Sequence, residues 1–298
     1  MYARLVRLAI ALALLGSAPL IGGLVTARPT SAQPAFTATA TIGVFADFAR
    51  QVGGARVEVF QLLGDGVDPH EYQMTPSDLV NVSRSQVFLY NGLGFEPFLN
   101  QVFQAMPPGI TRVALAEGLP TLTVDGAPDP HLWLDPQLAQ RYVERIRDAF
   151  SAQDPAGAAE YQANAARYLA ELEALDRELE AQLADIPPAH RQLVTTHNAF
   201  AYFARRYGFA VIGAVLSSEA REPSPGELIA LLQQIRSAGA RALFVEPQFD
   251  SRQVAQLVEQ TQLRVMPLYS DALPPDGSIR SYIDMMRANA RNIAAALR

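Results

Sequence analysis

The chain holds four histidines and no cysteine among its 298 residues. Without cysteine no thiolate nucleophile, zinc finger or disulfide can form, so a transition-metal site must use imidazoles and carboxylates. Three of the histidines, His70, His131 and His197, lie at or just past the ends of segments that are typical of β-strands. That edge is where open α/β sheets bind ligands, so these three are candidate metal ligands. His190 lies outside any such position and is predicted to be an exposed surface residue.

Three imidazoles need one more donor to complete a tetrahedral site. Asp271 follows the predicted strand 264–269 and is the preferred fourth ligand, and Glu246, at the end of the predicted strand 242–246, is its rival. Each half of the chain would then supply two ligands to an ion between the halves. Four protein ligands leave no open position for an activated water, which favours binding over catalysis.

A metal-dependent hydrolase, with Glu71 as its base, is a more distant alternative. The run His70-Glu71-Tyr72-Gln73-Met74 begins like the H-E-x-x-H motif, but Met74 stands where the second histidine belongs. No G-x-S-x-G elbow or phosphate-binding glycine loop is present either. We therefore expect no enzyme activity.

The elements that must position these residues alternate between strands and helices in both halves, which predicts two parallel-sheet α/β lobes. Predicted strands of the first half are 39–45, 56–63, 87–90 and 112–115, and those of the second are 192–196, 209–215, 242–246 and 264–269. Between them, 156–184 keeps apolar residues at spacings of three and four, which predicts one helix of about 45 Å. Because α/β patterns flank it, a helix linking two lobes is favoured over a coiled coil.

The first 32 residues predict an exported protein. Arg4 and Arg7 precede the apolar stretch 8–25, and Thr30-Ser31-Ala32 suits signal peptidase. An uncleaved anchor is the alternative. Because no cysteine is available for acylation, we expect a periplasmic or extracytoplasmic protein that is not a lipoprotein. The predicted domains are a signal peptide (1–32), an N-terminal lobe (33–153), a linking helix (154–186) and a C-terminal lobe (187–298).

The net charge argues against nucleic acid as a partner. It is −6 for the whole chain, and loss of residues 1–32 would leave 21 arginines against 30 acidic residues. Binding to a phosphate backbone needs clustered positive charge, and an acidic body does not supply it.

Eight sequence motifs along nearly the whole predicted mature chain resemble the metal-binding solute-binding proteins of ABC importers, the ZnuA/TroA-like group. They are DPHEYQMTPSDL, NGLGFE, DPHLWLDP, DPAGAAEYQANAARYLAELEALD, TTHNAFAYFARRYG, EPSP, FVEPQF and SDALPPDGSIRSYIDMMRAN. The resemblance implies two α/β lobes joined by one long helix, and the metal ligands His70, His131, His197 and Asp271. It also implies delivery of the ion to an ABC permease and its ATPase, and we expect a monomer.

Two departures from the family pattern are present, and we expect the first of them to leave the metal site intact. Met74 replaces the proline usual in the first motif, and the stretch 117–130 lacks the histidine-rich loop of many zinc-specific members. His197 stands where manganese or iron carriers usually have glutamate. Three imidazoles and one carboxylate suit Zn²⁺, so we expect zinc, with Mn²⁺ or Fe²⁺ as alternatives. A third possibility is a surface adhesin whose metal only stiffens the lobes.

Overall fold

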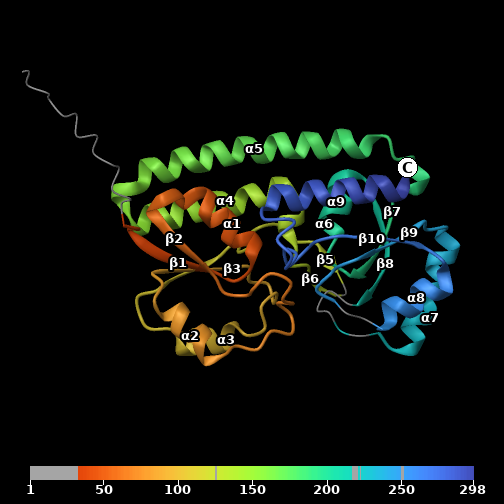
Figure 1. Ribbon diagram of the computed structural model, residues 1–298, viewed down its shortest axis with the longest axis horizontal. Helices are drawn as coiled ribbons and strands as arrows, with labels where there is room; N and C mark the ends of the chain where they lie inside the picture. The colour runs from red at the N-terminus through yellow and green to blue at the C-terminus, as the bar shows by residue number, and fades with distance from the viewer. Residues whose placement is uncertain (1–32, 125, 217–220, 222, 250–251) are drawn as a thin grey trace, which may run out of the picture. The chain divides into compact units, whose positions relative to one another are not determined.

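Two four-stranded parallel sheets form the framework of the protein (Figure 1). The computed structural model describes residues 33–124, 126–216, 221, 223–249 and 252–298. The first sheet has the order β2-β1-β3-β4 and the second the order β10-β9-β7-β8. Their strands are β1 (Phe36–Ala40), β2 (Val57–Gln61), β3 (Val87–Tyr90), β4 (Thr111–Ala114), β7 (Gln192–His197), β8 (Ala210–Leu216), β9 (Ala242–Val245) and β10 (Arg264–Pro267). This confirms the prediction of two parallel-sheet α/β lobes.

Helices follow the strands in both lobes, as right-handed crossovers between parallel strands require. They are α1 (Gly43–Gly53), α2 (Pro76–Ser83), α3 (Leu99–Ala105), α4 (Pro136–Gln153), α6 (Ala201–Tyr207), α7 (Pro225–Ala238), α8 (Arg252–Thr261) and α9 (Tyr282–Leu297). Several begin at the caps that the sequence offers. Thr75 and Asp78 form a capping box at α2, and Asp135 caps α4 just before Pro136.

One long helix, α5 (Ala158–Ala184), runs beside helices of both lobes (Figure 1). It packs against α1 and α4 of the first lobe and α9 of the second. One row of side chains at spacings of three and four is buried in these contacts: Tyr161, Ala165, Tyr168, Leu172, Leu175, Leu179 and Leu183. The predicted linking helix is therefore present, preceded by a short 3-10 turn at Pro155–Gly157.

The structure differs from the sequence prediction in a few places. The predicted strand 39–45 is β1 ending at Ala40, and α1 already begins at Gly43. Apolar residues continue without a break from strand to helix because both elements are buried, so periodicity does not mark the boundary. His190 is half-buried rather than exposed, and its ring Nδ1 lies 3.0 Å from the carbonyl oxygen of Leu297.

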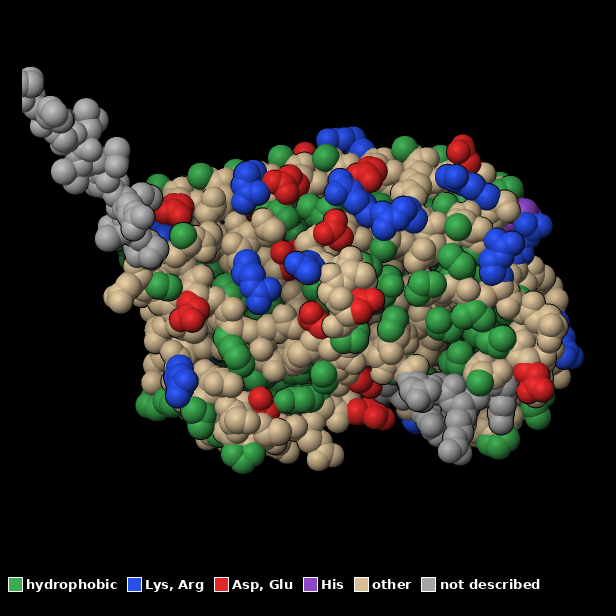
Figure 2. Space-filling view, viewed as in Figure 1, with side chains coloured by type: hydrophobic (Ala, Val, Ile, Leu, Met, Phe, Trp, Pro, Cys, Tyr) green, Lys and Arg blue, Asp and Glu red, His purple; other side chains and the backbone are tan. Residues whose placement is uncertain are grey.

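Residues 33–298 pack as one compact unit. The predicted signal peptide, 1–32, lies outside the described residues, and the predicted domain boundaries stay a prediction. Among the described helices, none combines the length and the apolar character needed to cross a bilayer. On the face drawn in Figure 2, arginine and acidic side chains are interspersed, and histidine contributes almost no surface.

Candidate metal centre

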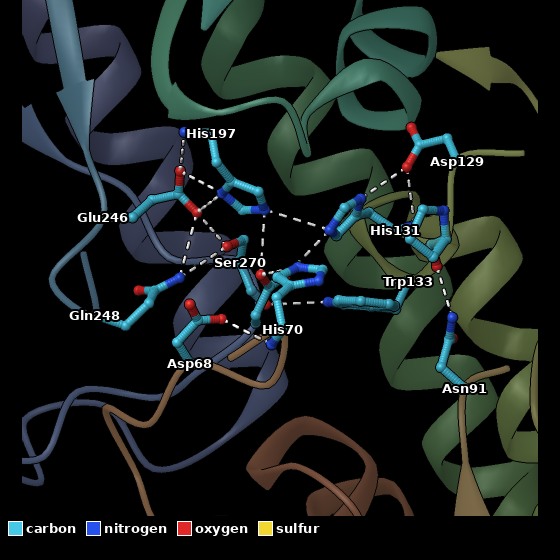
Figure 3. Close-up of polar contacts among 12 residues, drawn as sticks. Asp68, His70, Asn91, Asp129, His131, Trp133, His197, Glu246, Gln248 and Ser270 are labelled. Carbon is cyan, nitrogen blue, oxygen red and sulfur yellow. Dashed lines mark hydrogen bonds and ion pairs between the residues drawn. The ribbon is translucent and has the colours of Figure 1, made fainter. Parts of the chain in front are cut away.

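His70, His131, His197 and Asp271 converge between the two lobes, as Figure 3 shows for the three imidazoles. One potential ligand atom from each residue lies within 4.8 Å of the others. His70 follows β2, His131 follows a small hairpin of β5 (Thr123–Val124) and β6 (Ala127–Pro128), His197 ends β7, and Asp271 follows β10. The structure thus brings together the four residues predicted as ligands.

The distances within this cluster suit a small ion held by four ligands. The Nε2 atom of His197 lies 3.1 Å from an oxygen of Asp271, and the Nε2 atoms of His70 and His131 lie 3.4 and 3.6 Å from oxygens of the same carboxylate. The Nε2 atoms of His131 and His197 are 3.3 Å apart. Bonds of 2.0–2.1 Å from a tetrahedral zinc would separate neighbouring ligand atoms by about 3.3 Å.

Buried polar atoms without hydrogen-bond partners also point to a cation. Three of the buried side-chain atoms without a hydrogen-bond partner belong to the cluster, namely His70 Nε2 and both carboxylate oxygens of Asp271. Leaving such atoms unpaired is costly, which indicates that an ion completes the site. Burial alone would raise the pKa of Asp271, but the neighbouring side chains of His197 and His131 hold it well below its usual value. Asp271 is therefore a carboxylate, as a metal ligand must be.

Asp129 fixes the ring of His131. Its Oδ1 accepts from the backbone N–H of His131 at 3.0 Å and lies 2.7 Å from the ring Nδ1. The neighbouring Pro130 carbonyl accepts from Asn91 Nδ2, and the Asp129 carbonyl accepts from the hydroxyl of Tyr202. The ring can therefore present only Nε2 to the centre of the cluster.

Glu246 fixes the ring of His197 in the way that Asp129 fixes the ring of His131. The Glu246 carboxylate accepts from the backbone N–H of His197 at 3.1 Å, and both its oxygens lie 2.8 Å from the ring Nδ1. Burial lowers the pKa of His197, but the carboxylates of Glu246 and Asp271 raise it more, so the pKa lies well above its ordinary value. Glu246, the rival for the fourth ligand position, thus lies behind the His197 ring and not among the four converging residues.

Trp133 connects the segment that carries Asp271 to the first lobe. Its Nε1 donates to the carbonyl oxygen of Ser270 at 3.1 Å, and its own carbonyl accepts from the hydroxyl of Tyr282 at 2.7 Å. At the other end of the segment, the backbone N–H of Tyr282 donates to Asp47 at 2.8 Å. Asp271 is therefore placed by contacts on both sides of it in the chain.

The lobes are further joined away from the ligands. The hydroxyl of Tyr202 on α6 also accepts from the backbone N–H of Leu122 in the first lobe at 2.9 Å. Arg206 on α6 forms an ion pair with Asp176 on α5. These contacts and the long helix limit how far the lobes can separate without breaking buried hydrogen bonds.

The sequence predicted the four converging residues but not all of the hydrogen-bond partners that position them. Asp129 carried a local signal, since it precedes His131 in an Asp-Pro-His tripeptide shared with residues 68–70. Nothing in the sequence singled out Trp133 as the donor to Ser270. Glu71, the base of the hydrolase alternative, is exposed and lies outside the cluster.

Proteins with similar sequences are named for different metals. The manganese-binding lipoprotein MntA of Halalkalibacterium halodurans is 32% identical over 261 residues, which cover 86% of this chain and 87% of that protein. The zinc-binding protein TroA of Treponema pallidum is 31% identical over 268 residues, covering 86% and 87% of the two chains. Overall sequence similarity thus leaves the metal open.

The solved structure of the periplasmic zinc-binding protein TroA from Treponema pallidum superimposes with a TM-score of 0.83. It is 29% identical, and the match covers 88% of this chain and 99% of that one. The two-lobed fold with its long connecting helix is therefore shared with a protein that is named for binding zinc.

One prediction is contradicted by these relatives. We expected a protein that is not a lipoprotein because the sequence contains no cysteine, yet MntA is named a lipoprotein. Relatives that match this chain over most of its length thus include proteins named as lipoproteins. The extracytoplasmic location is supported.

The sequence family described as the periplasmic component A of a zinc-uptake complex, ZnuA, matches residues 39–296. That range includes all of both sheets except the first three residues of β1, together with the long helix and all four converging residues. The chain therefore belongs to the ZnuA family of metal-binding solute-binding proteins of ABC importers, which are not enzymes.

Proposed function

We propose that this protein captures Zn²⁺ with His70, His131, His197 and Asp271 and delivers it to the permease of an ABC importer. The observation that carries the proposal is the convergence of four buried ligand atoms within 4.8 Å. Three imidazoles and one carboxylate form a nitrogen-rich, four-ligand set that zinc favours. Manganese prefers more oxygen ligands and a larger coordination shell, which makes it a poorer match for this ligand set. Mn²⁺ and Fe²⁺ remain the alternative cargoes.

Delivery requires the closed site to open at the permease. Buried hydrogen bonds between the lobes, such as Trp133 to Ser270 and Tyr282 to Asp47, favour small local changes over a wide separation of the lobes. We infer that docking supplies the free energy that displaces a ligand or a ligand-bearing segment.

The ligand assignment is tested by zinc affinity in competition with a chromophoric chelator. His197→Ala should bind zinc far more weakly than the parent protein, whereas Glu178→Gln, an exposed substitution outside the cluster, should not change the affinity. Equal zinc affinity in His197→Ala and the parent protein would show that the site is elsewhere.

The metal is tested separately, because a nitrogen-rich site binds zinc more tightly than manganese whatever its natural cargo. Elemental analysis of protein purified from its native compartment should find zinc, and competition in vitro should favour zinc over manganese. Manganese or iron in the native protein, despite a preference for zinc in vitro, would support the alternative cargo.

A further inference from the structure

A tight turn at residues 246–249, with the sequence EPQF, follows β9 directly. The backbone N–H of Phe249 donates to the carbonyl oxygen of Glu246 at 3.1 Å, which closes the turn. Pro247 has a fixed φ that suits the second position of such a turn. The turn therefore brings the side chains of Gln248 and Phe249 back toward the end of β9, where Glu246 contacts His197.

Both of these side chains contact residues of the metal centre. Gln248 Nε2 donates to Glu246 Oε2 at 3.4 Å and to the hydroxyl oxygen of Ser270 at 3.2 Å (Figure 3). The Phe249 ring lies against the imidazole of His197, with ring centroids 4.8 Å apart and ring planes inclined at 55°. Phe249 thus covers the imidazole whose Nδ1 is bonded to Glu246.

Phe249 lies between buried charged groups and the surface of the second lobe. Its side chain is half-buried and also packs against the apolar core of that lobe, whereas Glu246 is 1% exposed and His197 is fully buried. In the first lobe, Phe95 packs against the other two imidazoles at ring distances of 5.1 and 5.8 Å and is itself fully buried. On the second-lobe side, the thickness of one ring therefore separates a ligand imidazole from the surface.

An apolar ring at this place controls what reaches the pair formed by Glu246 and His197. The attraction between a carboxylate and a ligand imidazole is stronger where water is excluded, because the local dielectric constant is lower. The hydrophobic shell of a metal site also sets solvent access to the ion. A phenyl ring has no lone pair that could bind the metal or compete for Nδ1, so it excludes water without replacing a ligand.

We propose that Phe249 is a positioning residue of the metal site, a cover that keeps water and small competing ligands away from His197 and Glu246. The proposal rests on the zinc-binding function proposed above. With the cover in place, the ion leaves when the protein changes conformation. Without the cover, a small chelator reaches the bound ion directly.

The experiment measures zinc release to a small chelator at several chelator concentrations, all in excess over the protein. In the parent protein the release rate should not depend on chelator concentration, because opening of the site limits it. In Phe249→Ala the rate should rise in proportion to chelator concentration and exceed the parent rate by about tenfold, the lower end of the effect of losing a group that supports a ligand. Phe249→Tyr keeps the ring and should restore the parent behaviour.

Phe209→Ala is the matched control. Phe209 packs against Phe203 with ring centroids 6.0 Å apart and precedes β8, whose other end pairs with His197. The control therefore removes a ring from the same lobe at the opposite end of the sheet. Its zinc release should stay independent of chelator concentration, even if lower stability makes that release faster.

The dependence on chelator concentration decides the proposal. Release from Phe249→Ala that stays independent of chelator concentration, at any rate, would show that Phe249 is no cover, and so would a parent protein whose release already rises with chelator. If Phe249→Ala does not fold, Phe249→Val provides the same comparison with a side chain too short to cover the imidazole. A parent protein that binds no zinc would instead refute the function on which the proposal rests.

Discussion

Glu246 lies directly behind His197, with both carboxylate oxygens 2.8 Å from the ring Nδ1. The two residues stand at the ends of β7 and β9, which are neighbours in the second sheet, so the sheet itself sets this contact. Glu246 also accepts from the hydroxyl of Ser270, the residue before Asp271. One carboxylate thus contacts the proposed ligand His197 and the residue before a second proposed ligand, Asp271, while lying outside the cluster of four.

Glu246→Gln should weaken zinc binding by about 10–100-fold, the usual effect of losing such a partner of a ligand histidine. Glutamine keeps an acceptor for Nδ1 but loses the negative charge that makes the ring a stronger donor. Zinc affinity measured by chelator competition checks this, and the visible spectrum of bound Co²⁺ should shift as the ligand field weakens. Glu178→Gln is the matched control. A Glu246→Gln protein with the parent affinity and the parent Co²⁺ spectrum would contradict the role.

Trp133→Phe should shorten the residence time of zinc. The substitution keeps an aromatic ring near Phe95 but removes the Nε1–H that donates to Ser270, next to Asp271. Loss of this buried hydrogen bond should lower the free energy of unfolding by about 1 kcal/mol. Stopped-flow release of zinc to a chelator measures the kinetic effect.

Tyr161→Phe is a suitable control for that experiment. It removes a hydroxyl that donates to Asp154 at 2.7 Å, away from the metal ligands. It should cost a similar free energy of unfolding and leave zinc release unchanged. Faster release in both variants would mean that the effect follows general stability and not the Trp133 contact.

The sequence predicted most of this fold because its signals were local. The buried row of α5 follows the spacing of three and four that predicts one helix over 156–184. Three of the four proposed ligands, His70, His197 and Asp271, were found because each lies at or past the end of a strand in a parallel sheet, whereas His131 follows the antiparallel hairpin of β5 and β6. The features of the site that the sequence did not predict depend on contacts between residues that are distant in sequence. The choice between Asp271 and Glu246 as ligand is one example, because both follow strands and only the packed sheet shows which side of His197 each occupies.

Asp47→Ala should destabilise the protein by about 1–3 kcal/mol, because it leaves a buried donor without an acceptor. Asp47 lies on α1, accepts from the backbone N–H of Tyr282 at the start of α9, and accepts from the hydroxyl of Tyr168 on α5 at 3.3 Å. Burial is the main reason that its pKa is raised. Urea unfolding in the absence of metal measures the loss.

Asp47→Asn tests whether the acceptor or the charge matters at this position. Its side-chain oxygen can still accept from Tyr282, so it should retain more of the parent stability than Asp47→Ala. If both variants unfold at the same urea concentration as the parent protein, the contact between α1 and α9 contributes nothing to stability.

Glu96 should make the metal-free protein less stable as the pH rises from about 4.5 to about 7. Glu96 is buried within the loop between β3 and α3, where it accepts from Thr41 Oγ1 at 2.8 Å and from the backbone N–H groups of Asn91 and Gly92. Burial raises the pKa of Glu96 from 4.5 to about 7, although these hydrogen bonds and the nearby His70 lower it in part. The folded protein therefore keeps the proton over a pH range in which the unfolded chain has released it.

The direction of this change in stability follows from the difference in bound protons. Between the two pKa values the folded state binds more protons than the unfolded state, so the free energy of unfolding falls as the pH rises, and it levels off above the folded pKa. With a shift from 4.5 to about 7, the loss reaches about 3 kcal/mol. Urea unfolding at intervals from pH 4.5 to 8, with a chelator present, should show this slope in the parent protein and in Glu117→Gln, an exposed control. Glu96→Gln has no carboxyl group to titrate at this position, so its free energy of unfolding should fall by about 3 kcal/mol less over this pH range. Parallel curves for the parent protein and Glu96→Gln would assign the pH dependence to other groups.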